Sequence, residues 1–421
     1  MSSKKKSSSK KALRPIPAPS LGAALIGKEE EKLALQVLRS RALFRYYGPD
    51  PKRPPMMVAT LEKEFRKLSG AKYALAVTSG TAALEAALGA LGVGPGDEVI
   101  VPAWSWISCF TAIVRVGGKP VLAEINDTLS LDPKEIARLT TPRTKAVLVV
   151  HFQGVAADMD PIIAEAKKAG IAVLEDCAQS PGVIYKGKRI GTIGDIGIYS
   201  FQHNKTITSG EGGMLVTNNP RLYERAVRMS DLGQMRPYHA QQVPPSEPGF
   251  AGSQFRMPEI IGALALAQVR KLDKIRKHCR KLNARIMKKI GKLPGIKFRT
   301  IPDPKGDSGF EIYFWPATKE LRDAFRNKLI EAKIPCTQMT GTYAQYRREY
   351  VVTGLAHAPS ATPFPVGPGW PAKGYRQEDF PVTEDLAPRF VVLPIGMNFT
   401  EADADRIAAA VVQIHRELGI S

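Results

Sequence analysis

The stretch YSFQHNKTITSGEGGMLVTN, Tyr199–Asn218, decides the fold of this 421-residue chain. It connects two short apolar runs, 196–201 and 213–217, through a turn rich in glycine and hydroxylated residues. Apolar and β-branched runs of this length predict buried strands. One lysine, Lys205, lies on the turn. A lysine on a turn is ordinarily solvated, and the alternative is a lysine held at a strand end for the chemistry of its amine.

Similar apolar runs precede this stretch and alternate with helical patterns. The runs are 73–78, 98–102, 119–125, 146–152 and 171–176. Helical patterns occur at 28–40, 58–69, 319–332 and 401–418. Continuous apolar strands that alternate with helices predict the α/β class, with a mainly parallel sheet flanked by helices. Ligands bind such sheets at the carboxyl ends of the strands.

The sequence predicts three parts. Residues 1–20 contain many Lys and Ser and too few apolar residues to fold, so we expect a disordered basic tail. Residues 21–290 form a large domain that ends in one long helix near 258–290. Residues 291–421 form a smaller C-terminal α+β domain. Residues 340–388, rich in Pro, Gly and aromatic side chains, are expected to form an extended surface segment near the site or a partner subunit.

Composition excludes several classes of protein. The 44% hydrophobic and 24% charged residues are ordinary for a soluble enzyme. Four cysteines without CxxC spacing and six histidines without HxxxH or HExxH pairing indicate neither a disulfide framework nor a protein-held metal, and they fit a reducing cytoplasm. No apolar run approaches the roughly 18 residues that span a bilayer. We therefore expect a cytoplasmic protein with no membrane partner.

The net charge of +20 raises the question of nucleic acid. Part of this charge lies in the tail, at Lys4, Lys5, Lys6, Lys10, Lys11 and Arg14. Much of the remainder lies on segments such as 270–292, which has the pattern of a basic helix face. Aromatic residues do not interleave with these charges as they do on a platform that stacks bases. Attraction of small anionic substrates explains the charge at least as well, so nucleic acid is not the expected partner.

The segment VTSGTAALEAAL, 77–88, combines a strand end with a helix start. A Ser-Gly-Thr turn there exposes backbone N–H groups at the positive end of a helix, which favours an anion such as phosphate. Gly80 would let the backbone approach the phosphate, and the hydroxyls of Ser79 and Thr81 would add hydrogen bonds. The alternative is that Ser79 merely caps the helix.

The segment LEDCAQS, 174–180, places Glu175 and Asp176 at the end of an apolar strand. A buried carboxylate there needs a partner, and a protonated heterocyclic nitrogen is one candidate. A salt bridge or a helix cap is the alternative. The phosphate cradle, Asp176 and Lys205 follow one another at strand ends of one sheet. This order suits pyridoxal 5′-phosphate, in which a lysine binds the cofactor covalently and a carboxylate pairs with the pyridine nitrogen.

Several motifs, taken in order, resemble those of one enzyme family. They are SGTAALEAALGALGVGPGDEVIVPAWSW, TPRTKAV, ADMD, EDCAQS, YKGKRIGTIGDIGIYSF and KTITSGEGG. From about residue 28 to its C-terminus, the chain resembles the DegT/DnrJ/EryC1/StrS family of sugar and cyclitol aminotransferases. The resemblance implies a fold-type I pyridoxal-phosphate transferase. It also implies Lys205, in place of the histidine that some dehydratase relatives carry, as the cofactor lysine.

The resemblance assigns further roles at the site. Asp176 becomes the partner of the ring nitrogen, Gln179 the neighbour of the ring hydroxyl, and Trp106 the aromatic side chain stacked on the cofactor. The implied phosphate ligands are Gly80, Thr81 and Ser200, with Ser79 beside them. The stretch SQFRM, 253–257, corresponds to a family segment that reaches the neighbouring subunit's site. It implies a homodimer with Gln254, in place of the usual Asn, and Arg256 near the partner's phosphate.

Other features resemble the branch that makes 8-amino-3,8-dideoxy-octulosonate by amination of C8 of an oxidised octulosonate. They are FRYYGPD, LAEINDTLSLDP, KTITSGEGG, TNN and FRTIPDPKGDSGF. This resemblance implies a role in lipopolysaccharide sugar synthesis, with glutamate or glutamine as amino donor. Keto-inositols and nucleotide-linked keto-sugars are alternative acceptors. An alternative of another class is a non-catalytic regulatory or nucleic-acid-binding protein on the same fold.

Overall fold

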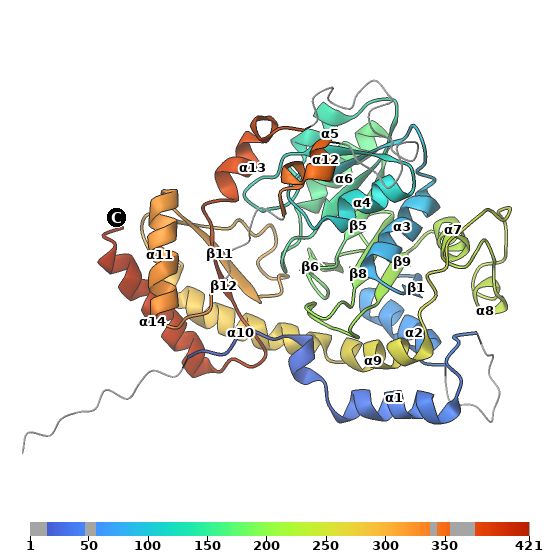
Figure 1. Ribbon diagram of the computed structural model, residues 1–421, viewed down its shortest axis with the longest axis horizontal. Helices are drawn as coiled ribbons and strands as arrows, with labels where there is room; N and C mark the ends of the chain where they lie inside the picture. The colour runs from blue at the N-terminus through green and yellow to red at the C-terminus, as the bar shows by residue number, and fades with distance from the viewer. Residues whose placement is uncertain (1–14, 47–55, 337–342, 354–374, 421) are drawn as a thin grey trace, which may run out of the picture.

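The computed structural model describes residues 15–46, 56–336, 343–353 and 375–420. These residues form a larger part around a seven-stranded sheet and a smaller part around a three-stranded sheet (Figure 1). A two-stranded ribbon completes the strand pairing. None of the described helices is both long and apolar enough to cross a membrane.

The seven strands of the large sheet lie in the order β1–β9–β8–β5–β4–β2–β3. Their bounds are β1 Tyr73–Val77, β2 Glu98–Pro102, β3 Lys119–Ala123, β4 Thr144–Val150, β5 Ala172–Asp176, β8 Ile196–Ser200 and β9 Gly213–Thr217. Of these strands, β9 is antiparallel to both neighbours, and the remaining pairs are parallel. The predicted α/β class with a mainly parallel sheet is therefore confirmed, and the strand ends differ from the expected ones by no more than two residues.

Helices cover both faces of this sheet (Figure 1). They are α2 Met57–Ser69, α3 Gly80–Leu91, α4 Ser108–Arg115, α5 Lys134–Leu139, α6 Met159–Ala169, α7 Pro220–Ser230 and α9 Glu259–Val269. In β4, Val147 and Val149 pack in the core shared with α2, α6 and α9. Leu148 and Val150 pack in the core shared with α3, α4 and α7. Because both faces are buried, the strands show continuous rather than alternating apolar runs.

The prediction of a single helix at 258–290 is wrong, because the chain forms two helices there. Helix α9 ends at Val269, and α10 spans Leu272–Ile290. At the break, Arg270 forms ion pairs with acidic residues of α1 (Lys28–Ser40) and α2, and Lys271 pairs with Glu30 of α1. The sequence has no Gly or Pro at this position, and its apolar periodicity continues across the break. The break coincides instead with ion pairs to other helices.

The smaller part contains an antiparallel sheet in the order β10–β11–β12. Its elements are β10 Ile296–Phe298, β11 Glu311–Pro316, α11 Lys319–Glu331, β12 Val391–Pro394 and α14 Glu401–Glu417. Helix α10 packs along α14, so it connects the two parts. Short elements complete the described chain: η1 Gly22–Leu25, β6 Ile184–Tyr185, β7 Lys188–Arg189, α8 Pro237–Ala240, η3 Gln345–Arg347, α12 Glu349–Thr353, η5 Gln377–Asp379 and α13 Pro381–Leu386.

Residues 15–20, expected to belong to a disordered tail, lie instead against the smaller part. Ile16 is buried, and the backbone N–H of Ser20 donates to Oδ1 of Asn398 at 3.1 Å. The Nδ2 group of Asn398 donates to the carbonyl of Ala18 at 2.8 Å, and Met397 N–H donates to the carbonyl of Ser20 at 2.7 Å. One apolar side chain and backbone pairing hold this segment in place. The rest of the expected tail, 1–14, lies outside the described residues.

The segment 340–388 lies partly outside the described residues, which exclude 337–342 and 354–374. Where it is described, it forms short helices rather than an extended segment. Its backbone is anchored next to α4, because Ser105 N–H donates to the carbonyl of Tyr343 at 2.9 Å. The expectation that this segment lies near the site agrees with the position of Tyr343, which lines the cavity described below.

Candidate active site

One cavity of about 440 Å³ lies at the carboxyl ends of β5 and β8, beside the start of α3. The site residues predicted within a single chain all line it: Ser79, Gly80, Thr81, Trp106, Asp176, Gln179, Ser200 and Lys205. They meet because β1, β5 and β8 run in the same direction, so their ends share one edge of the sheet. The structure therefore brings these side chains together, and their individual roles stay predictions.

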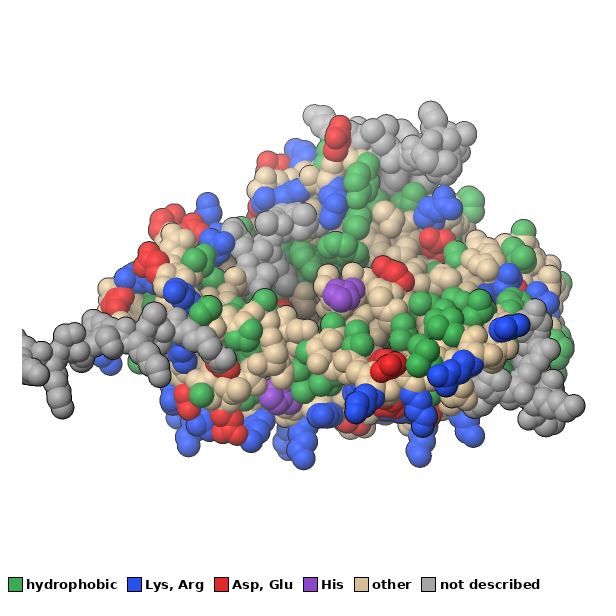
Figure 2. All heavy atoms as spheres, turned by 60° about the horizontal axis from the view of Figure 1, so that its bottom comes forward, with side chains coloured by type: hydrophobic (Ala, Val, Ile, Leu, Met, Phe, Trp, Pro, Cys, Tyr) green, Lys and Arg blue, Asp and Glu red, His purple; other side chains and the backbone are tan. Residues whose placement is uncertain are grey.

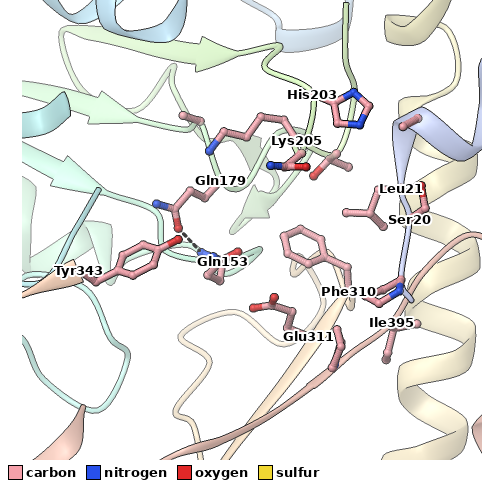
Figure 3. A pocket seen from close by; sticks show the side chains of 16 residues that line it. Ser20, Leu21, Gln153, Gln179, His203, Lys205, Phe310, Glu311, Tyr343 and Ile395 are labelled. Atoms are coloured by element: carbon pink, nitrogen blue, oxygen red, sulfur yellow. Dashed lines mark hydrogen bonds between the residues drawn. The ribbon is translucent and has the colours of Figure 1, made fainter. Parts of the chain in front are cut away.

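The turn that carries Lys205 is closed by hydrogen bonds across its base. Phe201 N–H donates to the carbonyl of Gly212 at 2.8 Å, and Ser209 N–H donates to the carbonyl of Phe201 at 3.0 Å. Lys205 N–H donates to the carbonyl of Gln202 at 2.9 Å. A Cβ atom on Gly212 would lie 2.9 Å from Oγ of Ser209, so this loop needs a glycine there. The closed loop points the side chain of Lys205 into the site (Figure 3).

The carboxylate of Asp176 is buried, and the side chain of Lys205 is partly buried. Burial lowers the pKa of Lys205, and attraction to Asp176 partly opposes this change. Burial also raises the pKa of Asp176, against its hydrogen bonds and the charge of Lys205. Its Oδ1 accepts from Ala178 N–H at 2.8 Å, and its Oδ2 accepts from the thiol of Cys109 at 3.1 Å. A lowered amine pKa favours the neutral, nucleophilic form.

The start of α3 is capped by Ser79 and leaves backbone N–H groups without a partner, as the predicted anion cradle requires. Oγ of Ser79 accepts a hydrogen bond from Ala82 N–H at 3.0 Å, which confirms the cap. The N–H groups of Gly80 and Thr81 find no acceptor among the described residues, as the first turn of a helix lacks intrahelical partners. A Cβ on Gly80 would lie 2.8 Å from Cβ of Ser200. The backbone therefore approaches β8 closely and presents free N–H groups.

Two further predicted residues, Trp106 and Gln179, line the same cavity. Trp106 is 47% exposed, and its ring meets that of Tyr343 edge-on, with 5.9 Å between the ring centroids. Such an exposed aromatic face is free to stack on a flat ligand. Gln179 is buried, and its Oε1 accepts from Gln153 N–H at 3.3 Å (Figure 3).

Gln254 and Arg256 do not line the cavity of their own chain. The side chain of Arg256 forms an ion pair with Asp231 and lies over the ring of Phe44, 5.5 Å from its centroid. Gln254 is exposed. Thr78 N–H donates to the carbonyl of Phe255 at 3.0 Å, so this segment runs beside the end of β1. Their expected contact with a neighbouring subunit's phosphate stays a prediction.

A second cavity, of about 370 Å³, adjoins the first and shares Gln179, Lys205 and Tyr343 with it (Figure 3). It also includes residues that the sequence analysis did not identify. These are Ser20 and Leu21 of the N-terminal segment, Gln153 and His203 of the larger part, and Phe310, Glu311 and Ile395 of the smaller part. They come from segments far apart in the chain, and no motif or spacing marks them.

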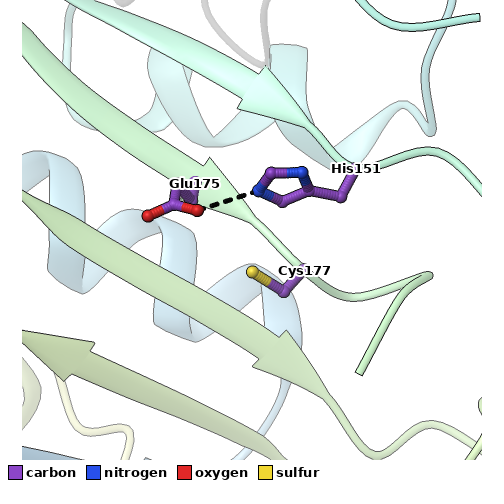
Figure 4. Close-up of side chains that lie close together, drawn as sticks. All are labelled: His151, Glu175 and Cys177. Carbon is purple, nitrogen blue, oxygen red and sulfur yellow. Dashed lines mark hydrogen bonds and ion pairs between the residues drawn. The ribbon is translucent and has the colours of Figure 1, made fainter. Parts of the chain in front are cut away.

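His151, Glu175 and Cys177 are buried and lie close together at the ends of β4 and β5 (Figure 4). Glu175 Oε2 lies 2.9 Å from Nε2 of His151, and its carboxylate also accepts from the N–H groups of Gly191, at 2.7 Å, and Gly194, at 2.6 Å. The other ring nitrogen of His151 accepts from a backbone N–H. These groups are thus engaged in hydrogen bonds that fix the loop after β7, and the absence of a metal stays a prediction.

The donor set of the first cavity fits pyridoxal phosphate. It contains an amine whose neutral form is favoured, a buried carboxylate for a ring nitrogen, an exposed aromatic ring, and unpaired N–H groups at a helix start. The family model of DegT/DnrJ/EryC1/StrS aminotransferases matches residues 26–412. The chain belongs to this family. DegT/DnrJ/EryC1/StrS aminotransferases use pyridoxal phosphate, so the predicted enzyme class and cofactor are confirmed.

Solved structures of other aminotransferases share this fold over nearly the whole chain. The 3-amino-5-hydroxybenzoic acid synthase is 28% identical, covers 95% of this chain and 98% of its own, and gives a TM-score of 0.77. An aminotransferase from Psychrobacter cryohalolentis is 25% identical, with coverages of 96% and 100% and a TM-score of 0.78. DesV of S. venezuelae, solved with a ketimine intermediate, is 27% identical, with coverages of 92% and 94% and a TM-score of 0.75. The predicted fold-type I architecture is therefore confirmed.

Proposed function

We propose that this protein transfers an amino group from glutamate or glutamine to a keto or aldehyde sugar, with Lys205 and Asp176 as its catalytic residues. One observation carries the proposal: the partly buried amine of Lys205 and the buried carboxylate of Asp176 open into the same cavity as a helix start with unpaired N–H groups. Bound pyridoxal phosphate supplies an electron sink that stabilises negative charge on a substrate carbon. The other chemical tasks fall to side chains of this chain.

Lys205 binds the cofactor and carries protons. Burial lowers the pKa of its amine, so Nζ is available as a base within the cavity. There it accepts a proton from the α-carbon of the amino donor and returns a proton to the carbon of the acceptor. The closed loop 201–212 holds the side chain in reach of both substrates.

Asp176 holds a proton on the ring nitrogen of the cofactor. A cationic ring nitrogen satisfies the buried carboxylate, because an opposite charge stabilises its ionised form. Ala178 N–H and the thiol of Cys109 fix the orientation of the two carboxylate oxygens. Gly80 and Thr81 would hold the phosphate through their N–H groups, with Ser79 and Ser200 beside them. Trp106 would stack on the ring, and Gln179 would bind its hydroxyl.

For the acceptor, we favour C8 of an oxidised 3-deoxy-octulosonate, on the way to 8-amino-3,8-dideoxy-octulosonate for lipopolysaccharide. The support is the set of sequence features shared with that branch, such as FRYYGPD and FRTIPDPKGDSGF, and a net charge of +20 that attracts anions. Keto-inositols and nucleotide-linked keto-sugars are the rival acceptors. A cytoplasmic location fits these substrates and the cysteine pattern.

A homodimer would complete the site. Apolar side chains remain exposed on α1 and the turn after it: Leu35, Leu38, Leu43 and Phe44. Figure 2, in which the side that carries α1 comes forward, shows hydrophobic side chains gathered on this face. Because Arg256 lies on the ring of Phe44, a partner that covers this surface also approaches Gln254 and Arg256. A two-fold axis would then bring Gln254 and Arg256 of each subunit to the start of α3 in the other subunit.

Covalent labelling and turnover test the proposal together. Purified protein should be yellow, lose its colour with borohydride, and carry the reduced cofactor on the peptide that contains Lys205. The Lys205→Ala protein should fold and bind cofactor without turnover. Wild-type protein should then aminate at least one of three acceptors with glutamate or glutamine: the oxidised octulosonate, a keto-inositol or a nucleotide-linked 4-keto sugar. Label on a different lysine, or full activity of Lys205→Ala, would overturn the assignment.

A further inference from the structure

Glu311 is an acidic side chain in the second cavity that the proposed chemistry does not use. It begins β11 of the smaller part, where it pairs with Pro394 of β12. It lines the cavity that also contains Lys205 (Figure 3). Since the first cavity holds the predicted cofactor residues, Glu311 lies on the side that remains for substrate.

A buried tyrosine orients the carboxylate of Glu311. The hydroxyl of Tyr313 donates to Oε2 of Glu311 at 2.6 Å. No described residue donates a hydrogen bond to the other oxygen, Oε1. In Figure 3 the carboxylate points into the cavity from β11. One oxygen is therefore fixed by the protein, and the second is available to a ligand.

Among the described residues, no cationic side chain lies at ion-pair distance from the carboxylate of Glu311. Arg299 is the nearby cation, but its guanidinium donates to backbone carbonyls, including that of Thr128 at 2.8 Å and that of Phe152 at 2.9 Å. Burial raises the pKa of Glu311 to about 7, against the hydrogen bond from Tyr313 and the attraction of Arg299. The phenol of Tyr343 also faces this carboxylate.

The rest of the second cavity supplies neutral polar groups. Ser20, Gln153, Asn204 and Tyr343 line it, together with His203 and with Lys205, whose amine the proposed function assigns to the cofactor. No Arg lines this cavity among the described residues. Because the pKa of Glu311 is about 7, the carboxylate predominates above that pH. In that ionised form it favours a ligand that donates hydrogen bonds, and it repels a carboxylate or a phosphate.

We propose that Glu311 recognises the acceptor, with Oε1 accepting hydrogen bonds from the hydroxyl groups beside the carbon that receives the amino group. This inference rests on the proposed function and narrows its substrate class. The part of the acceptor next to the reacting carbon is a neutral polyol, and any acid group of the same molecule lies away from Glu311. A site built to bind a hydroxyl discriminates strongly against an analogue that lacks it.

The two halves of the reaction separate this role from a structural one. The first half is followed by the absorbance change of the holoenzyme with glutamate alone, and the second by its reversal when an acceptor is added after the glutamate is removed. The acceptor probes are a keto-inositol, the C8 aldehyde of 3-deoxy-octulosonate and a nucleotide-linked 4-keto sugar. Each is compared with its analogue lacking the hydroxyl next to the carbonyl.

In Glu311→Gln, the second half should slow by about 10- to 100-fold, the range expected for loss of one charge-assisted hydrogen bond. The first half should be unchanged or faster, because glutamate carries carboxylates that Glu311 repels. The deoxy analogue should be equally poor with both proteins. Tyr313→Phe, which removes only the orienting hydroxyl, should show a smaller loss in the second half.

Glu331→Gln is the matched control, because Glu331 is exposed at the end of α11 in the same part of the molecule. It should leave both halves unchanged. An equal loss in both halves for Glu311→Gln would make Glu311 a structural residue and overturn the inference. Unchanged kinetics in Glu311→Gln would overturn it as well. If wild-type protein turns over glutamate but none of the three acceptors, the proposed function itself fails, which is a distinct result.

Discussion

Replacing Gly80 by Ala should weaken cofactor binding without unfolding the protein. The new Cβ would lie 2.8 Å from Cβ and 3.1 Å from Oγ of Ser200. Carbon atoms in contact are normally about 3.5–4.0 Å apart, so the start of α3 and the end of β8 must separate by roughly 0.7–1.2 Å. Overpacking of this kind costs about 1–3 kcal/mol. Because the displaced atoms are those of the phosphate cradle, the cofactor dissociation constant should rise by about 5- to 150-fold.

The measurement is a titration of cofactor-free protein with pyridoxal phosphate, followed by absorbance. The melting temperatures of the cofactor-free proteins show how much of the overpacking lowers the stability of the fold instead of the affinity for the cofactor. Gly94→Ala is the control, because a Cβ there meets nothing within 4 Å. It should bind the cofactor as wild type does. Wild-type affinity in Gly80→Ala, at an unchanged melting temperature, would refute the close-approach argument and the cradle with it.

Three further predictions concern the ring nitrogen, the shared site and pH. Asp176→Asn should retain the cofactor but lose several orders of magnitude in rate, since the amide cannot hold the ring nitrogen protonated; wild-type turnover would assign that task to another group. Mixing inactive Lys205→Ala with inactive Arg256→Ala protein should restore up to one working site per heterodimer, and mixtures that exchange subunits yet stay inactive would remove Arg256 from a shared site. Glu259 is buried, and burial raises its pKa to about 7 from an ordinary 4.5. Its contribution to stability is therefore fully present below pH 4.5 and lost as pH rises through 7, by about 2–3 kcal/mol between pH 5 and pH 8. Urea unfolding between pH 5 and pH 8 should show a smaller decline for Glu259→Gln, and equal declines would contradict this reasoning.

The sequence was sufficient for the sheet and for grouping the residues that line the first cavity. Strands buried on both faces produce continuous apolar runs, which are visible without a structure. Parallel strands then bring their carboxyl ends to one edge, so Asp176 and Lys205 could be placed together with the turn at Gly80 from their order alone. These residues could be placed because each lies on a local feature of the sequence, namely a strand end or the turn that follows it.

The second cavity could not be predicted, because it is assembled from distant segments. Glu311 and Tyr343 reach the cavity through the packing of the smaller part on the larger, and neither lies in a local motif. The break between α9 and α10 depends on ion pairs of Arg270 and Lys271 with residues of α1 and α2. Periodicity within one segment contains no information on such contacts.

The segment 15–20 bears on the order in which the chain can assemble. Its hydrogen bonds join Ser20 to Asn398, 378 positions further along the chain. Since Ser20 and Leu21 line the substrate cavity, that wall cannot close until almost all of the chain has been synthesised. The seven-stranded sheet needs only residues 73–217, so the strand ends that carry Asp176 and Lys205 can pair before the wall of the second cavity closes. Contacts of long sequence separation also form slowly, and pyridoxal phosphate should therefore be able to enter a nascent enzyme before its substrate pocket exists.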